Sequence, residues 1–308
     1  MKYVIFGGTG FIGRALTSYW MNEGHEVMIV SRNKDKSTAG SAGSVQTAPA
    51  YWTWDELGED PAPLAGGNVF VNLAGATLNQ RWTSRAKQSI LESRLKATRE
   101  VARLSKAITP GPEVILQASA VGIYGTSVTD EFTENYRLDQ VHSDFLTRVT
   151  EQWEAAADEG FEGRRLVKLR TGVVLGNGGG AFPLMRLPFL LGVGGKIGSG
   201  RQWVPWIHLY DLIRLIDFCV QHSGISGPVN AVSPYPVSNQ QFGSCIARVY
   251  RRPDWIPLPG PILKLLLGEM SSLLLEGQKV VPEAALRAGF TFAYPGLEET
   301  LTELKSRK

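Results

Sequence analysis

Short apolar runs recur along the first half of the chain, and longer segments with helical periodicity separate them. The apolar runs have the length and composition of buried parallel strands and cover residues 3–6, 27–30, 69–72, 114–117 and 166–169. Apolar positions recur with the 3.6-residue period of a helix in residues 12–22, 84–108 and 144–158. This alternation predicts an α/β fold in which helices cover both faces of a parallel sheet.

The alternation becomes less regular after about residue 171. Glycine, serine and other small or polar residues predict exposed loops over 34–50 and 173–201. Residues 253–261 contain four prolines in nine positions, but apolar residues continue through the segment. We therefore expect a small C-terminal helical unit to begin there rather than a flexible linker.

Leucines dominate the start of that unit. The spacing i, i+3, i+4, i+7 predicts a packed helix through Leu263, Leu266, Leu267, Met270, Leu273 and Leu274. The alternative is that some of these leucines bind a partner.

Composition excludes several classes of protein. The chain has 308 residues, enough for one large or two modest domains, and 43% of them are apolar while 20% are charged. These fractions argue against disorder and against a coiled coil. The net charge of +3 is too small for a nucleic-acid-binding footprint, although the pI is about 8.8. We expect no nucleic-acid partner.

Metal, disulfide and membrane signals are weak. Cys219, Cys245 and the four histidines lack the spacing of metal ligands, so we expect buried thiols and no metal site. The N-terminal apolar run reaches glycine too early for a signal peptide. The longest apolar stretch, 262–275, is interrupted by polar residues and is shorter than the ~20 residues of a membrane span. A cytoplasmic protein is the expectation.

A glycine-rich loop follows the first predicted strand and opens the first predicted helix. The segment satisfies both G-x-G-x-x-G and G-x-x-G-x-x-G. In this context the pattern is typical of dinucleotide binding, because bare backbone approaches a pyrophosphate at the helix N-terminus. A tight turn without a ligand is the alternative. The candidate cofactor residues are Gly7, Gly8, Thr9, Gly10, Phe11, Ile12 and Gly13.

The end of the second strand predicts which dinucleotide binds. NAD sites usually have a carboxylate there for the ribose 2′-hydroxyl, but this strand ends in Ser31 and Arg32. Arginine pairs with a 2′-phosphate in bidentate fashion and stacks on adenine. The sequence therefore favours NADP(H), with a solvated basic turn as the alternative.

Further motifs make the chain similar to the extended short-chain dehydrogenase/reductase superfamily. More narrowly, it resembles the atypical "epimerase family" whose members end in a small domain of unknown function. The resemblance rests on the glycine loop and on residues 71–75, 81–82, 93–94, 119–125, 170–180, 198–203, 206–208 and 273–280. It implies a Rossmann doubly wound parallel sheet, with a smaller, mainly helical C-terminal domain on the substrate side.

The resemblance also implies roles for individual residues. Ser31 and Arg32 would hold the 2′-phosphate, and Ser119 would hydrogen-bond the reacting oxygen. Without the resemblance, Arg94 would be taken for a solvated helix arginine and Ser119 for a cap or turn residue. The remaining implied cofactor contacts are Leu73, Ala74, Gly75, Arg94, Val173 and again Ser119.

The chain departs from the superfamily at the acid–base pair. Most members use Tyr-x-x-x-Lys on one helix face, whereas Phe145 and Val149 are expected at those positions here. Tyr124 is a candidate replacement acid, with a structural role as the alternative. The segment containing Tyr136, His142 and Asp144 is another candidate of the same kind.

The substrate side is expected after the nucleotide-binding domain. We expect an NADP-binding domain over 1–172, re-entered at about 207–233, and a substrate-side domain over 173–308. Lys196 and Arg201 would meet an anionic group, and Trp203 would stack on a planar or sugar-like ligand. Packing of the domain junction is the alternative role for the tryptophan.

These expectations combine into a function. The chain is expected to be an NADP(H)-dependent oxidoreductase or epimerase-like enzyme acting on a small molecule such as a nucleotide sugar or a carbonyl compound. The alternative is a catalytically silent NADP-binding regulatory protein, for example one linked to cell division. Monomer and homodimer both fit the sequence.

Overall fold

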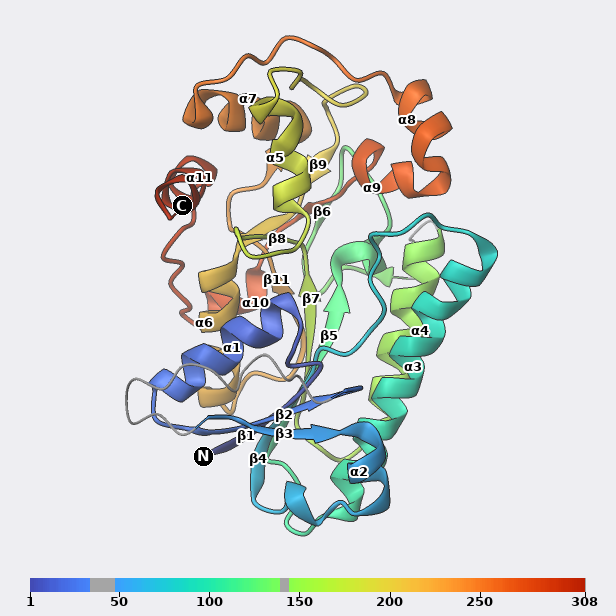
Figure 1. The fold of residues 1–308 in the computed structure, drawn as a ribbon, viewed down its shortest axis with the longest axis vertical. Coiled ribbons are helices and arrows are strands. Elements are labelled where there is room, and N and C mark those ends of the chain that lie inside the picture. Colours follow the sequence, from blue (N-terminus) through green and yellow to red (C-terminus); the bar gives the residue numbers. More distant parts are fainter. Residues whose placement is uncertain (34–47, 139–143, 308) are drawn as a thin grey trace.

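A seven-stranded sheet forms the centre of the computed structural model, which describes residues 1–33, 48–138 and 144–307 (Figure 1). Its strand order is β11-β7-β5-β4-β1-β2-β3, and every neighbouring pair is parallel. The strands are β1 (Lys2–Phe6), β2 (Glu26–Ser31), β3 (Ala50–Thr53), β4 (Gly67–Asn72), β5 (Val114–Ala120), β7 (Leu166–Thr171) and β11 (Gly227–Ala231). The predicted doubly wound α/β fold is confirmed.

Helices cover both faces of this sheet (Figure 1). One face carries α1 (Phe11–Asn22) and α6 (Leu209–Gln221), and the other carries α3 (Ser84–Ala107) and α4 (Phe145–Gly160). The short helix α2 (Trp54–Glu59) follows β3. The three helices expected from periodicity are confirmed, with ends within two residues of those predicted.

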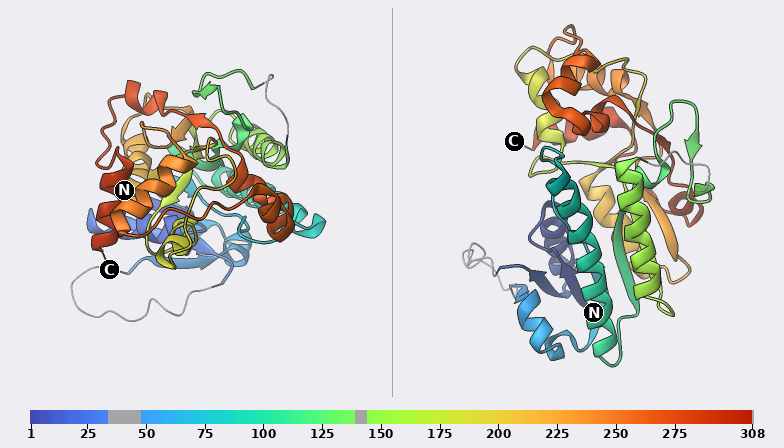
Figure 2. Two further views of the ribbon diagram at one scale, coloured as in Figure 1. Left: turned by 90° about the horizontal axis from the view of Figure 1, so that it is seen from above. Right: turned by 90° about the vertical axis from the view of Figure 1, so that its right-hand side faces the viewer.

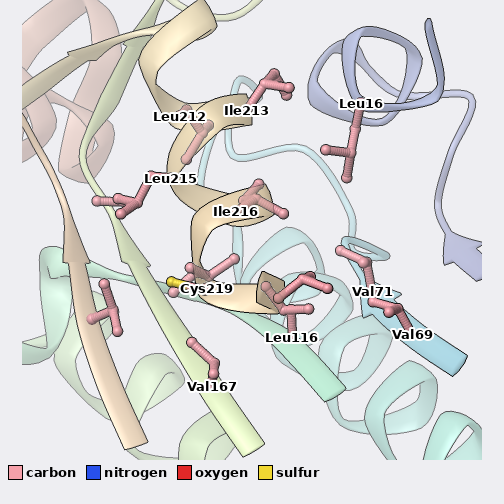
Figure 3. Close-up of a cluster of buried hydrophobic side chains, with 14 of the residues drawn as sticks. Leu16, Val69, Val71, Leu116, Val167, Leu212, Ile213, Leu215, Ile216 and Cys219 are labelled. Carbon is pink, nitrogen blue, oxygen red and sulfur yellow. The ribbon is translucent and has the colours of Figure 1, made fainter. Parts of the chain in front are cut away.

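Apolar side chains form a continuous core between the sheet and the helices α1 and α6 (Figure 3). Alternate residues of one strand, such as Val69 and Val71 of β4, point to this face because side chains alternate along a strand. They meet Leu16 of α1 and Ile216 of α6. Burying side chains of this size contributes about 1.5–3 kcal/mol each.

The opposite face uses the intervening residues of the same strands. Phe70 of β4 and Ile115 of β5 are fully buried against Val101 of α3 and Ala157 of α4. Strands that are buried on both faces read as continuous apolar runs. That is why these strands could be recognised in the sequence.

After β7 the chain returns to the sheet in α6 and β11, and most of its other segments build a second region over the carboxyl ends of the strands (Figures 1 and 2). This region has its own core, which includes Phe182, Trp206, Phe242 and Leu301. Among the described residues, no helix is long and apolar enough to cross a membrane. Two-stranded sheets accompany its helices, and in one of them β6 (Glu131–Phe132) pairs with β13 (Lys279–Val280). The later elements are β8 (Val173–Leu175), α5 (Phe182–Leu190), β9 (Trp203–Val204), β10 (Trp206–His208), β12 (Val237–Ser238), α7 (Asn239–Tyr250), α8 (Gly260–Leu267), α9 (Ser272–Leu275), β13 (Lys279–Val280), α10 (Glu283–Arg287) and α11 (Leu297–Ser306).

The two segments expected to be exposed loops contain regular structure where they are described. The exposed loop expected over 173–201 is wrong in part, because β8 and α5 lie within it. Most of the loop expected over 34–50 lies outside the described residues, and residue 50 begins β3. The glycine content around α5 hid a nine-residue helix whose first turn contains Pro183, a position that proline tolerates.

The single packed helix expected over the leucine run is also wrong. Helix α8 ends at Leu267, Gly268 with a φ of +59° turns the chain into a short 3-10 helix over Gly268–Ser271, and α9 begins at Ser272. The helical phase is lost across this turn, so the leucines do not share one buried face. Leu263 is buried, whereas Leu265 is 82% exposed and Leu266 64% exposed.

Asp211, in the first turn of α6, fixes the segment between α10 and α11. Its buried carboxylate accepts the backbone N–H groups of Ala293 at 2.7 Å and Tyr294 at 2.8 Å. We expect Asp211→Asn to lower the free energy of unfolding by about 1–3 kcal/mol, since the amide nitrogen cannot accept the second N–H. Urea denaturation measures this loss.

Asp217 on the same helix provides the matched control. The one hydrogen bond that its carboxylate accepts from the described residues comes from the Trp20 indole at 2.7 Å. An amide oxygen can replace that one acceptor, so Asp217→Asn should cost clearly less than Asp211→Asn. Equal losses for the two variants would contradict the role given to Asp211.

Candidate functional site

The glycine-rich loop connects β1 to α1 in a conformation that only glycine permits. Gly7 has a φ of +83°, and a Cβ on it would lie 3.0 Å from the backbone nitrogen of Ala74. A Cβ on Gly13 would lie 2.6 Å from Cα of Gly8. Gly10, the exposed N-cap, has no side chain to cap the helix, so N–H groups of the first turn stay accessible to an anion. The other predicted members of the loop are Thr9, Phe11 and Ile12.

The ring of Phe11 explains the glycines that follow β8. A Cβ on Gly176 would lie 2.7 Å from this ring, and one on Gly179 would lie 2.9 Å from it. The glycines therefore let the chain pack closely on the first residue of α1. Val173, a predicted cofactor contact, begins β8, and its N–H donates to the carbonyl of Pro205 at 2.7 Å.

The end of β2 presents a basic side chain. Ser31 is buried, and its hydroxyl donates to the carbonyl of Asn33. Arg32 is exposed and forms no hydrogen bond or ion pair with any other residue that the structure describes. Its guanidinium is thus available to a ligand at the edge where the glycine loop lies.

Arg94 of α3 braces the segment after β4. Its guanidinium donates to the carbonyls of Ala76 at 3.1 Å and Ile90 at 2.9 Å and lies 5.0 Å from the centroid of the Trp153 ring. Burial lowers the pKa of Arg94 to about 10, so the group is still charged at neutral pH. A Cβ on Gly75 would lie 3.3 Å from the Arg94 side chain. The structure thus brings together Arg94 and the predicted segment Leu73, Ala74 and Gly75.

Ser119, at the end of β5, belongs to a buried charged cluster. Its hydroxyl donates to Oε1 of Glu154, on α4, at 2.6 Å. Arg170 of β7 forms a bidentate pair with the same carboxylate, with both N···O distances at 2.9 Å. Sequence reasoning missed Glu154 and missed this role for Arg170. The available signal was a charged residue at the end of an apolar strand and another on the buried face of a helix.

Tyr124, the predicted replacement acid, also lies in this cluster. Its side chain is only 1% exposed, and burial raises its pKa to about 12. The phenol oxygen accepts a hydrogen bond from Arg170 at 2.8 Å and donates one to Asn230 at 2.8 Å. The structure therefore places Tyr124 within the protein, with partners for its hydroxyl on both sides.

The positions expected for the acid–base pair carry apolar side chains. Phe145 and Val149 pack against α3 in a separate apolar cluster. Leu146 and Thr150 face the turn after β5, since a Cβ on Gly122 would lie 3.3 Å and 3.6 Å from them. Leucine and threonine do not supply the acid–base chemistry of tyrosine and lysine either. Of the other candidates, Asp144 is the N-cap of α4 and His142 lies outside the described residues.

The predicted substrate residues lie apart from this cluster. Lys196 and Arg201 are exposed on the glycine-rich segment before β9. The Trp203 indole donates to the carbonyl of Val128 at 3.0 Å, and the ammonium of Lys279 lies 5.4 Å from its ring centroid. None of the three lines either pocket described next.

Two pockets lie along the carboxyl edge of the sheet. The smaller, of about 120 Å³, connects the loop end of α1 to the end of β5 through Ile12, Leu73 and Ser119. The larger, of about 400 Å³, has Trp82 and Phe145 on one wall and residues of α8–α9 on the other. The rings of Trp82 and Phe145 meet edge to face with their centroids 5.1 Å apart.

Comparison with known proteins gives matches over nearly the whole chain. A model of the NAD dependent epimerase/dehydratase family matches residues 3–238, and one of a domain of unknown function (DUF1731) matches residues 258–304. The chain is 44% identical over 308 residues to the epimerase family protein YfhF of Bacillus subtilis, covering 99% of this chain and 98% of that protein.

Solved structures agree with these matches. The crystal structure of the human epimerase family protein SDR39U1 with NADPH superposes with a TM-score of 0.90 at 36% identity and covers 100% of both chains. A nucleoside-diphosphate sugar epimerase from Corynebacterium glutamicum superposes with a TM-score of 0.75 at 30% identity. That match covers 99% of this chain and 58% of the other.

Proposed function

Because the chain belongs to the NAD dependent epimerase/dehydratase family, we propose that it binds NADP(H) and transfers hydride to or from a small molecule. The observation that carries this proposal is the glycine cradle at the accessible N-terminus of α1, with Arg32 exposed at the neighbouring strand end. The NADPH in the structure of the human relative supports the choice of cofactor. The enzyme class we propose is an oxidoreductase or an epimerase-like enzyme.

The strand order gives each part of the cofactor a place. Arg32 and Ser31, after β2, would hold the 2′-phosphate, and the loop 7–13 after β1 would hold the pyrophosphate at the helix N-terminus. Leu73–Gly75 after β4 would lie beside the adenosine. Ser119 after β5 would lie beside the nicotinamide and hydrogen-bond the reacting oxygen of the substrate. When bound, the cofactor supplies or accepts a hydride at nicotinamide C4.

The larger pocket is the proposed place for the part of the substrate that extends beyond the oxygen held by Ser119, which lines the smaller pocket. Its aromatic wall of Trp82 and Phe145 offers a flat apolar surface, and its other wall comes from the C-terminal region. A volume of about 400 Å³ is within the range of small-molecule sites. The exposed Lys196 and Arg201 would meet any anionic part of a substrate that extends out of this pocket.

Cofactor preference tests the proposal. We expect isothermal titration to show NADPH bound at least about tenfold more tightly than NADH, since a charge-assisted pair contributes about 1.5–3 kcal/mol. Arg32→Asp should abolish this preference, because a carboxylate repels the 2′-phosphate. Arg99→Asp, the same charge change at an exposed position of α3, is the control and should retain the preference. Equal affinities in the wild type, or a preference that survives Arg32→Asp, would contradict the role of Arg32.

A regulatory NADP-binding protein without turnover is the second candidate function. The observation that favours it is that α4 contains neither a tyrosine nor a lysine, so the usual acid–base pair is missing from this helix. A screen of carbonyl compounds and nucleotide sugars for NADPH oxidation separates the two. Tight NADPH binding with no oxidation across that screen would favour the regulator, and turnover would exclude it.

A further inference from the structure

The hydrogen of the Ser119 hydroxyl is directed away from any substrate. Ser119 Oγ lies 2.6 Å from Glu154 Oε1, and both side chains are buried. An ionised carboxylate only accepts hydrogen bonds. The serine must therefore be the donor in this contact, and its two lone pairs remain for other partners.

Glu154 is held in its ionised form. Burial alone would raise its pKa, but the hydrogen bonds and charge of Arg170 lower the pKa below the ordinary value, and the Ser119 hydrogen bond and Lys168 act in the same direction. The ammonium of Lys168 lies 3.5 Å from Oε2. At neutral pH this carboxylate has no proton to give back to the serine.

The other side of Arg170 is also fixed. Its Nη1 donates to the Tyr124 hydroxyl, which donates in turn to Oδ1 of Asn230. The Asn230 amide nitrogen donates to the carbonyl of Val281 at 2.9 Å. Each nitrogen of Arg170 thus has an acceptor, and rotating the guanidinium to release Glu154 would leave buried groups unpaired.

We propose that Glu154 is a positioning residue that makes Ser119 a hydrogen-bond acceptor toward the substrate, so that the site binds its substrate through a hydroxyl group rather than a carbonyl oxygen. A hydroxyl donates its hydrogen to Oγ, whereas a carbonyl oxygen needs a donor that Ser119 does not provide. The proposal rests on the proposed function, since it places Ser119 beside the nicotinamide. It identifies the complex of oxidised cofactor and alcohol as the favoured one.

Matched alcohol and ketone probes test this inference. The protein is saturated with NADP⁺, and dissociation constants for 2-propanol, acetone, cyclohexanol and cyclohexanone are measured by ligand-observed NMR titration. We expect each alcohol to bind at least about tenfold more tightly than the ketone of the same carbon skeleton. The ketone leaves the buried Ser119 oxygen without a donor, and an unpaired buried group lowers the affinity by this factor or more.

Two variants separate positioning from general damage. Ser119→Ala removes the acceptor but leaves the Glu154–Arg170 pair, and the alcohol preference should disappear. Glu154→Asp keeps the charge opposite Arg170 but withdraws it from Ser119 by one methylene, which frees the serine hydrogen. The ketone should then bind more tightly than it does to the wild type.

NADP⁺ titration distinguishes a failure of the proposed function from a failure of the role given to Glu154 and Ser119. If the wild type fails to bind NADP⁺, the proposed function fails. If NADP⁺ binds to the wild type and to both variants within about twofold, the probe affinities test the inference alone. Wild-type alcohol affinity no higher than ketone affinity, or an alcohol preference that survives Ser119→Ala, would then overturn it.

Discussion

Replacement of Arg170 by methionine is expected to lower the free energy of unfolding by about 3–5 kcal/mol, the usual loss when one partner of a buried ion pair is removed. The Arg170 side chain is 4% exposed and that of Glu154 is 6% exposed. The arginine donates two hydrogen bonds to Glu154 and one to Tyr124. Methionine fills much of the volume but leaves the carboxylate buried without its cation. Chemical denaturation at pH 7 measures the loss.

Lys168, two residues earlier on the same strand, is the matched control. Its ammonium lies 2.8 Å from Asp158, a carboxylate that is 57% exposed, and 3.5 Å from Glu154. Exposed pairs contribute about 0–1 kcal/mol, and Arg170 still neutralises Glu154 when Lys168 is absent. Lys168→Met should therefore cost much less than Arg170→Met, and equal costs would contradict the importance given to the buried pair.

The Glu154–Arg170 pair makes the free energy of unfolding depend on pH. The native pKa of Glu154 is below its ordinary value of about 4.3, so the stability that the pair contributes is fully present above that pH. It is lost as the pH falls through the native pKa. In Arg170→Met the unpaired carboxylate is more easily protonated. The difference in unfolding free energy between the two proteins should therefore narrow from pH 7 toward pH 3.

The sheet could be predicted only where each strand is uniformly apolar. The runs at 3–6 and 69–72 are buried on both faces, and their composition shows it. The edge strand β11 gives no such signal, because its sequence Gly-Pro-Val-Asn-Ala contains no apolar run. Proline is tolerated there because β11 lies at the edge of the sheet. Periodicity likewise predicted one leucine-rich helix, since a count of apolar spacings does not detect the turn at Gly268.

The glycine loop could be predicted because its chemistry is local, whereas the charged cluster could not. Seven consecutive residues carry the loop and its expected ligand. In contrast, Ser119 and Glu154 are 35 positions apart, and Tyr124 and Asn230 are 106 apart. Strand order and the facing of α4 bring them together, and neither is encoded in a short motif. The packing of Trp20 could not be predicted either. Its ring stacks on that of Tyr3, with centroids 4.0 Å apart, because α1 lies against β1 in the folded sheet.

NADPH affinity is expected to fall by about tenfold to a hundredfold when Gly13 is replaced by alanine. The new Cβ would lie 2.6 Å from Cα of Gly8, 2.7 Å from its carbonyl oxygen and 2.8 Å from that of Gly7. All three atoms are backbone, so the loop itself must move. Relieving such overpacking costs about 1–3 kcal/mol. The displaced N–H groups are those we propose for the pyrophosphate, and isothermal titration measures the loss of binding.

Gly58→Ala is the matched control for that loss. Gly58 lies in α2, and its nearest neighbour to an added Cβ, an Arg103 nitrogen, is 4.0 Å away. Alanine there should leave NADPH affinity unchanged and stabilise the fold by about 0.5–1 kcal/mol, as expected for glycine-to-alanine changes in a helix. If Gly13→Ala were folded and bound NADPH as tightly as Gly58→Ala, the pyrophosphate could not lie on this loop. The proposed placement of the whole cofactor, from Arg32 to Ser119, would then have to be abandoned.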